Sequence, residues 1–122
     1  RIHRIYYPGC FNDDVLESVF RPEEIVYLDN DAEDPGKAAL IADYRQAPFR
    51  DCVFDALFLQ DNHAEIGDVK EMLRTLKPGG IVIYSSNNCG SDVSIADLLK
   101  LPGLGQVNLQ FPHQDFTVLQ KA

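Results

Sequence analysis

The 122-residue sequence lacks the features that mark several large classes of protein. Its apolar runs are far shorter than the roughly 20 residues that a membrane-spanning helix needs. Its three cysteines, Cys10, Cys52 and Cys89, are odd in number and widely spaced, which fits neither a disulfide framework nor a zinc knuckle. No charged-then-apolar leader opens the sequence. We therefore expect a single cytoplasmic domain over residues 1–122, with reduced thiols, no metal and no membrane contact.

Basic residues are also in short supply. The chain has 11 Lys and Arg against 19 Asp and Glu, which gives a formal net charge of −8. The basic side chains are scattered along the sequence, so no basic patch is predicted, and a phosphate backbone would be repelled. This argues against a nucleic-acid partner, whereas a positively charged small ligand would be tolerated.

Short apolar runs bounded by Pro and Gly predict a series of strands. The predicted strands cover residues 2–7, 24–29, 53–59, 81–84, 106–111 and 116–120. Residues 38–44 are ambiguous, because their alanines suit a helix while Leu40 and Ile41 suit a strand; the context favours a strand.

Apolar residues at helical spacing predict three helices between these strands. The first begins at Asn12 and ends at Pro22, and the second begins at Asn62 and ends at the turn containing Pro78. The third begins at residue 91 or 92 and ends near Lys100. Asn62 and Glu65 stand at the spacing of a capping box.

Strands that alternate with helices imply a parallel sheet with right-handed crossovers. Only residues 112–115 separate the last two strands, so these should form an antiparallel hairpin. Cofactor sites in such sheets lie beyond the carboxyl ends of the strands, at the point where the strand order reverses. The loops after the first four strands are therefore the place to look for a site.

Residues 42–86 resemble the middle of the class I S-adenosylmethionine (SAM)-dependent methyltransferases. In that family an Asp ends the third strand, Pro-Phe follows, Phe-Asp begins the fourth strand, and Leu-Lys-Pro-Gly-Gly precedes the fifth. The matching residues are Asp43, Pro48-Phe49, Phe54-Asp55 and residues 76–80. The resemblance implies an α/β fold: a three-layer Rossmann-like core whose mostly parallel, twisted sheet ends in an antiparallel hairpin. It also implies SAM as the cofactor.

The sequence departs from that family in three places. The loop after the first strand, Pro8-Gly9-Cys10-Phe11-Asn12, has one glycine where the family has a Gly-x-Gly-x-Gly-like loop. The connections at residues 30–38 and 45–52 are shorter than a usual parallel crossover, which predicts a reduced helix complement. Arg1 immediately precedes the first strand, so no N-terminal helix is expected over the pocket.

The resemblance assigns cofactor contacts to the ends of the first four strands. These contacts are Gly9, Cys10, Asp29, Asn30, Asp43, Tyr44 and Gln60. Asp29 would accept hydrogen bonds from the ribose hydroxyls, and Asp43 would accept one from the adenine amino group, with Tyr44 flanking the ring. Each has a simpler interpretation: Asp29 as an exposed loop acid, Asp43 as an ordinary strand end, and Gly9 as a turn residue after Pro8.

Asp61 and His63 are the candidates for catalysis, because they follow the fourth strand, where the family places residues that face the transferred methyl group. His63 could serve as a general base. The alternative is that Asn62 caps a helix and His63 is a solvated residue of its first turn. The family's Asn/Asp-Pro-Pro-aromatic motif for methylating exocyclic amines is absent from the sequence, which also argues against a nucleic-acid base as substrate.

Three functions follow from these features. The first is a small SAM-dependent methyltransferase that acts on a small molecule. The second is a non-catalytic methyltransferase-like module that binds a nucleoside ligand or a protein partner, with a homodimer as one form. The third, a nicotinamide-dependent dehydrogenase, fits less well, because its glycine-rich fingerprint is missing and the terminal hairpin resembles the methyltransferases.

Overall fold

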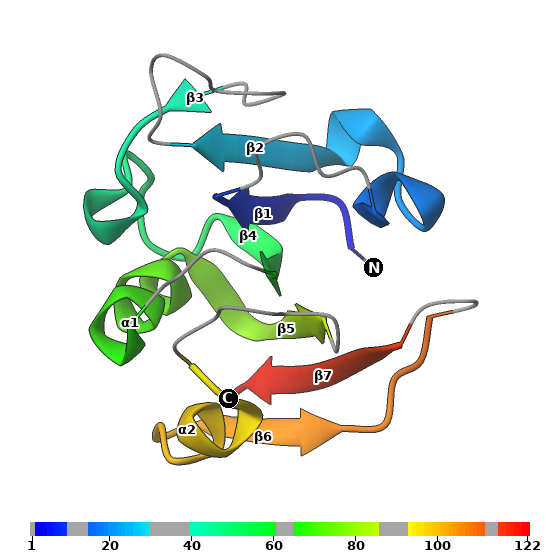
Figure 1. The fold of residues 1–122 in the computed structure, drawn as a ribbon, viewed down its shortest axis with the longest axis vertical. Coiled ribbons are helices and arrows are strands. Elements are labelled where there is room, and N and C mark those ends of the chain that lie inside the picture. The colour runs from blue at the N-terminus through cyan, green and yellow to red at the C-terminus, as the bar shows by residue number, and fades with distance from the viewer. Residues whose placement is uncertain (1, 10–14, 30–39, 61–64, 86–92, 112–114) are drawn as a thin grey trace.

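The computed structural model of the chain describes residues 2–9, 15–29, 40–60, 65–85, 93–111 and 115–122. Its strands form one seven-stranded sheet in the order β3-β2-β1-β4-β5-β7-β6 (Figure 1). The strands are β1 Ile5–Pro8, β2 Ile25–Asp29, β3 Leu40–Ile41, β4 Phe54–Leu59, β5 Leu76–Ser85, β6 Leu104–Val107 and β7 Phe116–Lys121. Every neighbouring pair from β3 to β5 is parallel, whereas β7 is antiparallel to both β5 and β6. The expected α/β fold with a terminal antiparallel pair is confirmed.

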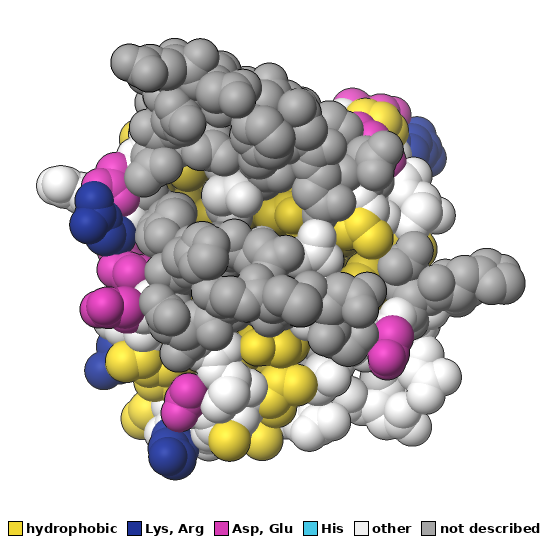
Figure 2. Space-filling view, viewed as in Figure 1, with side chains coloured by type: hydrophobic (Ala, Val, Ile, Leu, Met, Phe, Trp, Pro, Cys, Tyr) yellow, Lys and Arg dark blue, Asp and Glu magenta, His cyan; other side chains and the backbone are white. Residues whose placement is uncertain are grey.

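The helices of the described segments are few and short. They are α1 Ile66–Arg74, α2 Ile95–Leu99, and the 3₁₀ turns η1 Val15–Ser18, η2 Pro22–Glu24 and η3 Tyr44–Gln46. The prediction that Pro22 ends a helix is wrong, because Pro22 begins η2, a position where its missing N–H costs nothing. Within these segments, none of the helices is long and apolar enough to cross a bilayer. Apolar side chains are visible over α1 and α2 (Figure 2), where Ile66 and Leu99 are 38% and 43% exposed.

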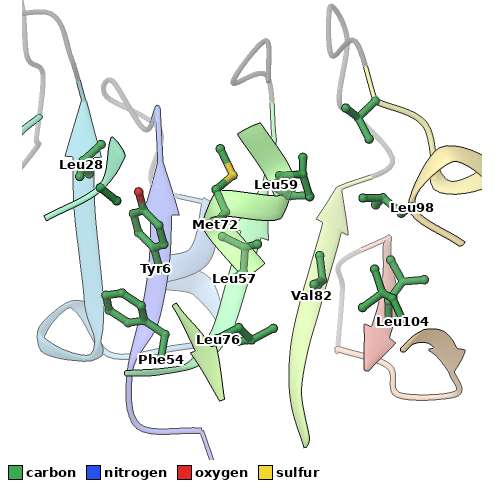
Figure 3. Packing of buried hydrophobic residues seen from close by; sticks show 14 residues of the cluster. Tyr6, Leu28, Phe54, Leu57, Leu59, Met72, Leu76, Val82, Leu98 and Leu104 are labelled. Atoms are coloured by element: carbon green, nitrogen blue, oxygen red, sulfur yellow. The ribbon is translucent and has the colours of Figure 1, made fainter. Parts of the chain in front are cut away.

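The core has two parts, one on each face of the sheet, because successive side chains of a strand point to opposite faces. Tyr6 and Leu57 face α1 and α2, whose Met72 and Leu98 complete that layer (Figure 3). Tyr7 and Phe58, each one position later, belong to the opposite layer, where η1 contributes Leu16. The three-layer arrangement is confirmed, with the thinner cover on the η1 face.

Helix α1 is shorter at both ends than the sequence predicts. It begins after Glu65, whose N–H donates to Asp68 Oδ2 at 3.0 Å, so Asp68 occupies the third helical position that a capping box requires. Asn62, the predicted cap, lies outside the described residues. The helix ends at Arg74, before the Lys-Pro-Gly-Gly turn, and Thr75 Oγ1 donates back to the Met72 carbonyl at 2.6 Å. The turn is therefore not what ends the helix.

Residues 77–80 instead form an irregularity inside the β4–β5 pairing. Leu76 pairs with Phe54 and Ile81 pairs with Ala56, so these four residues stand opposite Asp55 alone. Lys77 Nζ lies 3.1 Å from Asp55 Oδ1, and the other oxygen of Asp55 accepts from the backbone of residues 3 and 4. Burial raises the pKa of Asp55, but these hydrogen bonds outweigh it and hold that pKa below its usual value. Asp55 thus joins the start of β1 to the bulge of β5.

The strand predicted at residues 106–111 is instead β6 Leu104–Val107, which begins two residues earlier and ends four residues earlier. Phe111 is outside the strand, and its ring packs against Phe20, at 5.5 Å between centroids, and against Phe116, at 5.8 Å. Residues 108–115 therefore separate β6 from β7, and Phe111 within them helps to cover the η1 face. The sequence pattern could not distinguish residues 108–111 from a strand, because Leu109 and Phe111 continue the alternation of apolar residues that begins at Val107.

Candidate functional site

The strand order reverses between β1 and β4, and this is where parallel α/β sheets form a ligand crevice. Four predicted residues lie at the carboxyl ends of adjacent strands. Asp43 follows β3, Asp29 ends β2, Gly9 follows β1, and Gln60 follows β4. Because these strands are parallel neighbours, the structure brings all four residues to one edge of the sheet.

Gly9 has the left-handed backbone that a glycine favours at this point. Its φ is +68°, and its N–H donates to the Leu28 carbonyl at 2.7 Å. This hydrogen bond extends the β1–β2 pairing by one residue and turns the chain sharply beyond Pro8. A side chain here would strain the backbone, so the turn after β1 needs a glycine at this position.

Gln60 contacts Tyr7 across the switch point. Gln60 Nε2 lies 3.5 Å from Tyr7 Oη, a long hydrogen bond, and the Tyr7 ring is buried against Tyr27 and Phe58 at centroid distances of 5.9 and 4.8 Å. Tyr7, a buried residue, therefore places its hydroxyl beside Gln60, although sequence reasoning treated it only as part of a strand. The sequence feature that could have drawn attention to Tyr7 is its position: it carries a hydroxyl group and directly precedes the Pro-Gly turn that ends the first strand.

Asp43 carries a carboxylate that is already hydrogen-bonded. Oδ1 accepts from the backbone N–H of Arg45 at 2.9 Å, and the Arg45 guanidinium lies 3.0 Å from Oδ1 through Nε and 2.8 Å from Oδ2 through Nη2. These contacts begin η3 and, led by the Arg45 side-chain hydrogen bond, lower the pKa of Asp43. The carboxylate is ionised and partly exposed, at 41% of its side-chain surface. Sequence reasoning missed Arg45, although an Asp-x-Arg spacing was visible.

Aromatic packing against the core holds the loop between Asp43 and β4. Phe49 meets Tyr6 edge-on at 5.1 Å and Phe54 edge-on at 4.9 Å, while Tyr6 and Phe54 stack at 5.0 Å. Of the Pro-Phe and Phe-Asp pairs on which the family resemblance rests, Phe49 and Phe54 therefore pack with the core and Asp55 holds the start of β1, whereas Pro48 is exposed.

The remaining predicted residues divide into two groups. Cys10, Asn30, Asp61 and His63 lie outside the described residues, so both candidates for catalysis stay predictions. The backbones of Asp29 and Tyr44 are placed, at the end of β2 and the start of η3. Within the described segments, no group of three or more His, Cys, Asp or Glu side chains could hold a metal ion.

No protein-family model and no curated protein matches the chain. Solved structures do. A SAM-dependent methyltransferase from Methanosarcina mazei aligns over 97% of this chain and 92% of its own, with a TM-score of 0.62 and 14% identity. The chain has the class I methyltransferase-like fold.

Two further structures with this fold extend the comparison. The methyltransferase CalH, solved with S-adenosylhomocysteine (SAH), aligns over 98% of this chain with a TM-score of 0.63 and 14% identity. A chain from the complex between the Haloferax volcanii Trm112 methyltransferase activator and a candidate methyltransferase aligns over 67%, with a TM-score of 0.52 and 20% identity. This chain spans 51% of CalH and 44% of the Haloferax chain. At these identities the likeness concerns the fold, and function has to be argued from the site.

Proposed function

We propose that this chain binds SAM at the carboxyl edge of its sheet and transfers the methyl group to a small-molecule acceptor. The observation that carries the proposal is the line of Asp43, Asp29, Gly9 and Gln60 along that edge, in a sheet of the order β3-β2-β1-β4-β5-β7-β6. The methyltransferase-like fold and its SAM-dependent relatives in structure support it.

The chemistry of these residues suits a nucleoside ligand. A carboxylate accepts hydrogen bonds from an exocyclic amine or from two ribose hydroxyls, and Asp43 and Asp29 stand at neighbouring strand ends. In this proposal Asp43 holds the adenine amino group, Asp29 holds the ribose, and the tight backbone at Gly9 lets the methionine part approach the chain. Gln60 and the Tyr7 hydroxyl border the reacting end.

Bound SAM would supply a methyl group already activated on a sulfonium. The task left to the chain is to align the acceptor with that methyl group and to exclude water. Asp61 and His63, beyond Gln60 in the sequence, are proposed to face the acceptor, with His63 as a general base where the acceptor must lose a proton.

A thermal-shift titration with SAM and with SAH tests the proposal. A ligand that binds the native state raises stability by about 2.7 kcal/mol at 100 times its Kd, so the melting temperature should rise with ligand concentration. Asp29→Ala and Asp43→Ala should each reduce the rise, while Glu23→Ala, an exposed position before β2, should leave it unchanged. The absence of any shift at millimolar SAM and SAH would overturn SAM binding.

A second candidate function is a module that binds a protein partner. Ile66 and Leu99 are exposed on α1 and α2, and a groove of about 360 Å³ between these helices is lined in part by Ile66, Val93 and Leu101. The Haloferax relative in structure comes from a complex with an activator protein, which supports an assembly of this kind. Sedimentation of the purified chain distinguishes a homodimer from a monomer that awaits another protein.

A further inference from the structure

The Arg74 guanidinium ties the loop after η3 to the last turn of α1. Nη1 donates to the Phe49 carbonyl and to Asp51 Oδ1, both at 2.8 Å, and Nη2 lies 3.4 Å from the Ala47 carbonyl. One side chain thus holds three points within residues 47–51. The planar guanidinium can do this because its donors point in several fixed directions, which a lysine ammonium cannot match.

Glu71, one turn earlier on α1, fixes the orientation of Arg74. Its Oε1 accepts from Arg74 Nε at 2.7 Å, and its Oε2 accepts from Arg74 Nη2 at 2.9 Å, a two-point contact. Oε2 also accepts the backbone N–H of Ala47 at 3.2 Å. The Arg74 hydrogen bonds lower the pKa of Glu71, and Glu71 followed by Asp51 raises the pKa of Arg74, so both groups are charged at neutral pH.

Only the short turn η3 separates the loop held by this pair from the proposed adenine contact along the chain. Ala47 follows η3 directly, and η3 begins beside Asp43. On its other side Asp43 is held by β3, which pairs with β2 at only two positions. On the side of η3, the segment that leads away from Asp43 is held at residues 47–51 by the Phe49 ring in the core and by the Glu71–Arg74 pair on α1.

We propose that Glu71 and Arg74 are a positioning pair, which acts through the loop at residues 47–51 to set the Asp43 carboxylate for the adenine of the ligand. This rests on the proposed SAM binding. The pair touches no ligand atom in this proposal, and its effect is on the geometry of a neighbouring contact.

The test is a double-mutant cycle read by calorimetric titration of SAH, well below the melting temperature of each variant. Arg74→Lys keeps the positive charge but loses the planar guanidinium with its several fixed N–H donors, so it should weaken SAH binding by about three- to tenfold. Asp43→Asn should weaken it comparably or more. In the Asp43→Asn background, Arg74→Lys should cost little further affinity, because the contact that it positions is already lost.

A ligand-free measurement distinguishes this effect from general destabilisation. Arg74→Lys and Glu71→Gln should speed hydrogen exchange at the Arg45 amide, which donates to Asp43. Lys77→Met is the matched control, because it removes the ion pair with Asp55 at the opposite edge of the sheet. It should lower the melting temperature while leaving both the SAH affinity and the Arg45 exchange unchanged.

Three results would overturn the proposal. If wild type binds SAH and Arg74→Lys binds it equally well, positioning is wrong while SAM binding stands. If the losses from Arg74→Lys and Asp43→Asn add in full, Arg74 does not act through Asp43. If wild type fails to bind SAH, the proposed function fails and the positioning role fails with it.

Discussion

The ammonium group of Lys121, in the final strand, donates a hydrogen bond to the carbonyl oxygen of Leu76 at 2.6 Å. It also donates to the Leu73 carbonyl at 2.7 Å. Leu73 belongs to the last turn of α1, where the carbonyl groups carry a partial negative charge and a cation is favoured. A residue of the last strand thus contacts the end of a helix 48 positions earlier in the chain.

Lys121→Met should destabilise the protein by about 1–2 kcal/mol, because it keeps the apolar stem and removes a charged donor from two carbonyl groups. Urea unfolding should show a lower midpoint with an unchanged m-value. Lys100→Met, at an exposed position after α2, is the control and should change stability by less than about 0.5 kcal/mol. A Lys121→Met variant as stable as wild type would mean that water replaces the ammonium group at both carbonyls.

Replacing Gly80 and Gly67 by alanine should change the stability of the protein in opposite directions. A Cβ at Gly80 would lie 2.8 Å from the Lys77 carbonyl oxygen, a backbone atom that cannot easily move, so Gly80→Ala should cost about 1–3 kcal/mol. A Cβ at Gly67, within α1, would have no atom within 4 Å. Gly67→Ala should therefore gain up to about 0.5–1 kcal/mol from the higher helix propensity of alanine. Denaturant midpoints decide both signs, and equal effects at the two sites would contradict the packing at Gly80.

The succession of strands along the chain and the sheet edge that carries the candidate residues could be predicted from the sequence, because both follow from local signals. The apolar run at residues 53–59 and the Pro-Gly break after Tyr7 mark the ends of β4 and β1 within one residue. Once those ends are known, parallel pairing alone brings Gly9, Asp29 and Gln60 to one edge.

The features that the sequence did not predict depend on contacts between segments that are distant along the chain. The sequence predicts a helix stop at residues 77–80, yet these residues contact Asp55 through Lys77 and the side-chain amide of Gln120, at 3.1 Å, through the Gly79 carbonyl. The role of Arg74 likewise depends on a loop that precedes it by more than 20 residues. Periodicity carries no information about such partners.

Acid should weaken the protein in part through Glu71. The Arg74 hydrogen bonds lower its folded-state pKa below the ordinary value of 4.5, so its contribution is present above that pH and is lost as the pH falls through the lower folded value. Glu71→Gln should therefore be less stable than wild type at pH 7, and the two should converge as the pH is lowered to 3. Urea midpoints at several pH values measure this, with Glu23→Gln expected to follow wild type. Parallel curves for Glu71→Gln and wild type would refute the assignment.

Cys52 stands in a backbone conformation that favours glycine. Its φ is +56° in the turn before β4, and its N–H donates to the Arg74 carbonyl at 3.0 Å. Left-handed backbone costs a residue with a side chain about 1–2 kcal/mol, so Cys52→Gly should raise stability by roughly 0.5–1 kcal/mol after the entropy cost of glycine. Cys52→Ala keeps the strain and removes the thiol, so it should leave the melting temperature nearly unchanged. A comparable gain from Cys52→Ala would assign the effect to the thiol.

Arg45 should compete with the ligand for Asp43. In the ligand-free chain its guanidinium contacts both carboxylate oxygens, and the proposed adenine amine needs one of them. Both side chains of this ion pair are substantially exposed, so the competition should be modest: Arg45→Ala is expected to raise SAH affinity by about two- to fivefold at neutral pH. Asp43 stays ionised in the variant, because an ordinary aspartate has a pKa near 3.9.

Arg50→Ala removes another exposed cation from the same loop and is the control for the change in net charge. Equal gains from both variants would assign the effect to long-range charge rather than to release of Asp43. Weaker binding by Arg45→Ala would show that the guanidinium leaves the carboxylate and contacts the ligand itself. The three possible results are a gain in SAH affinity for Arg45→Ala alone, an equal gain for both variants, and a loss for Arg45→Ala. One set of SAH titrations on the two variants therefore establishes whether the Asp43–Arg45 pair opposes binding or takes part in it.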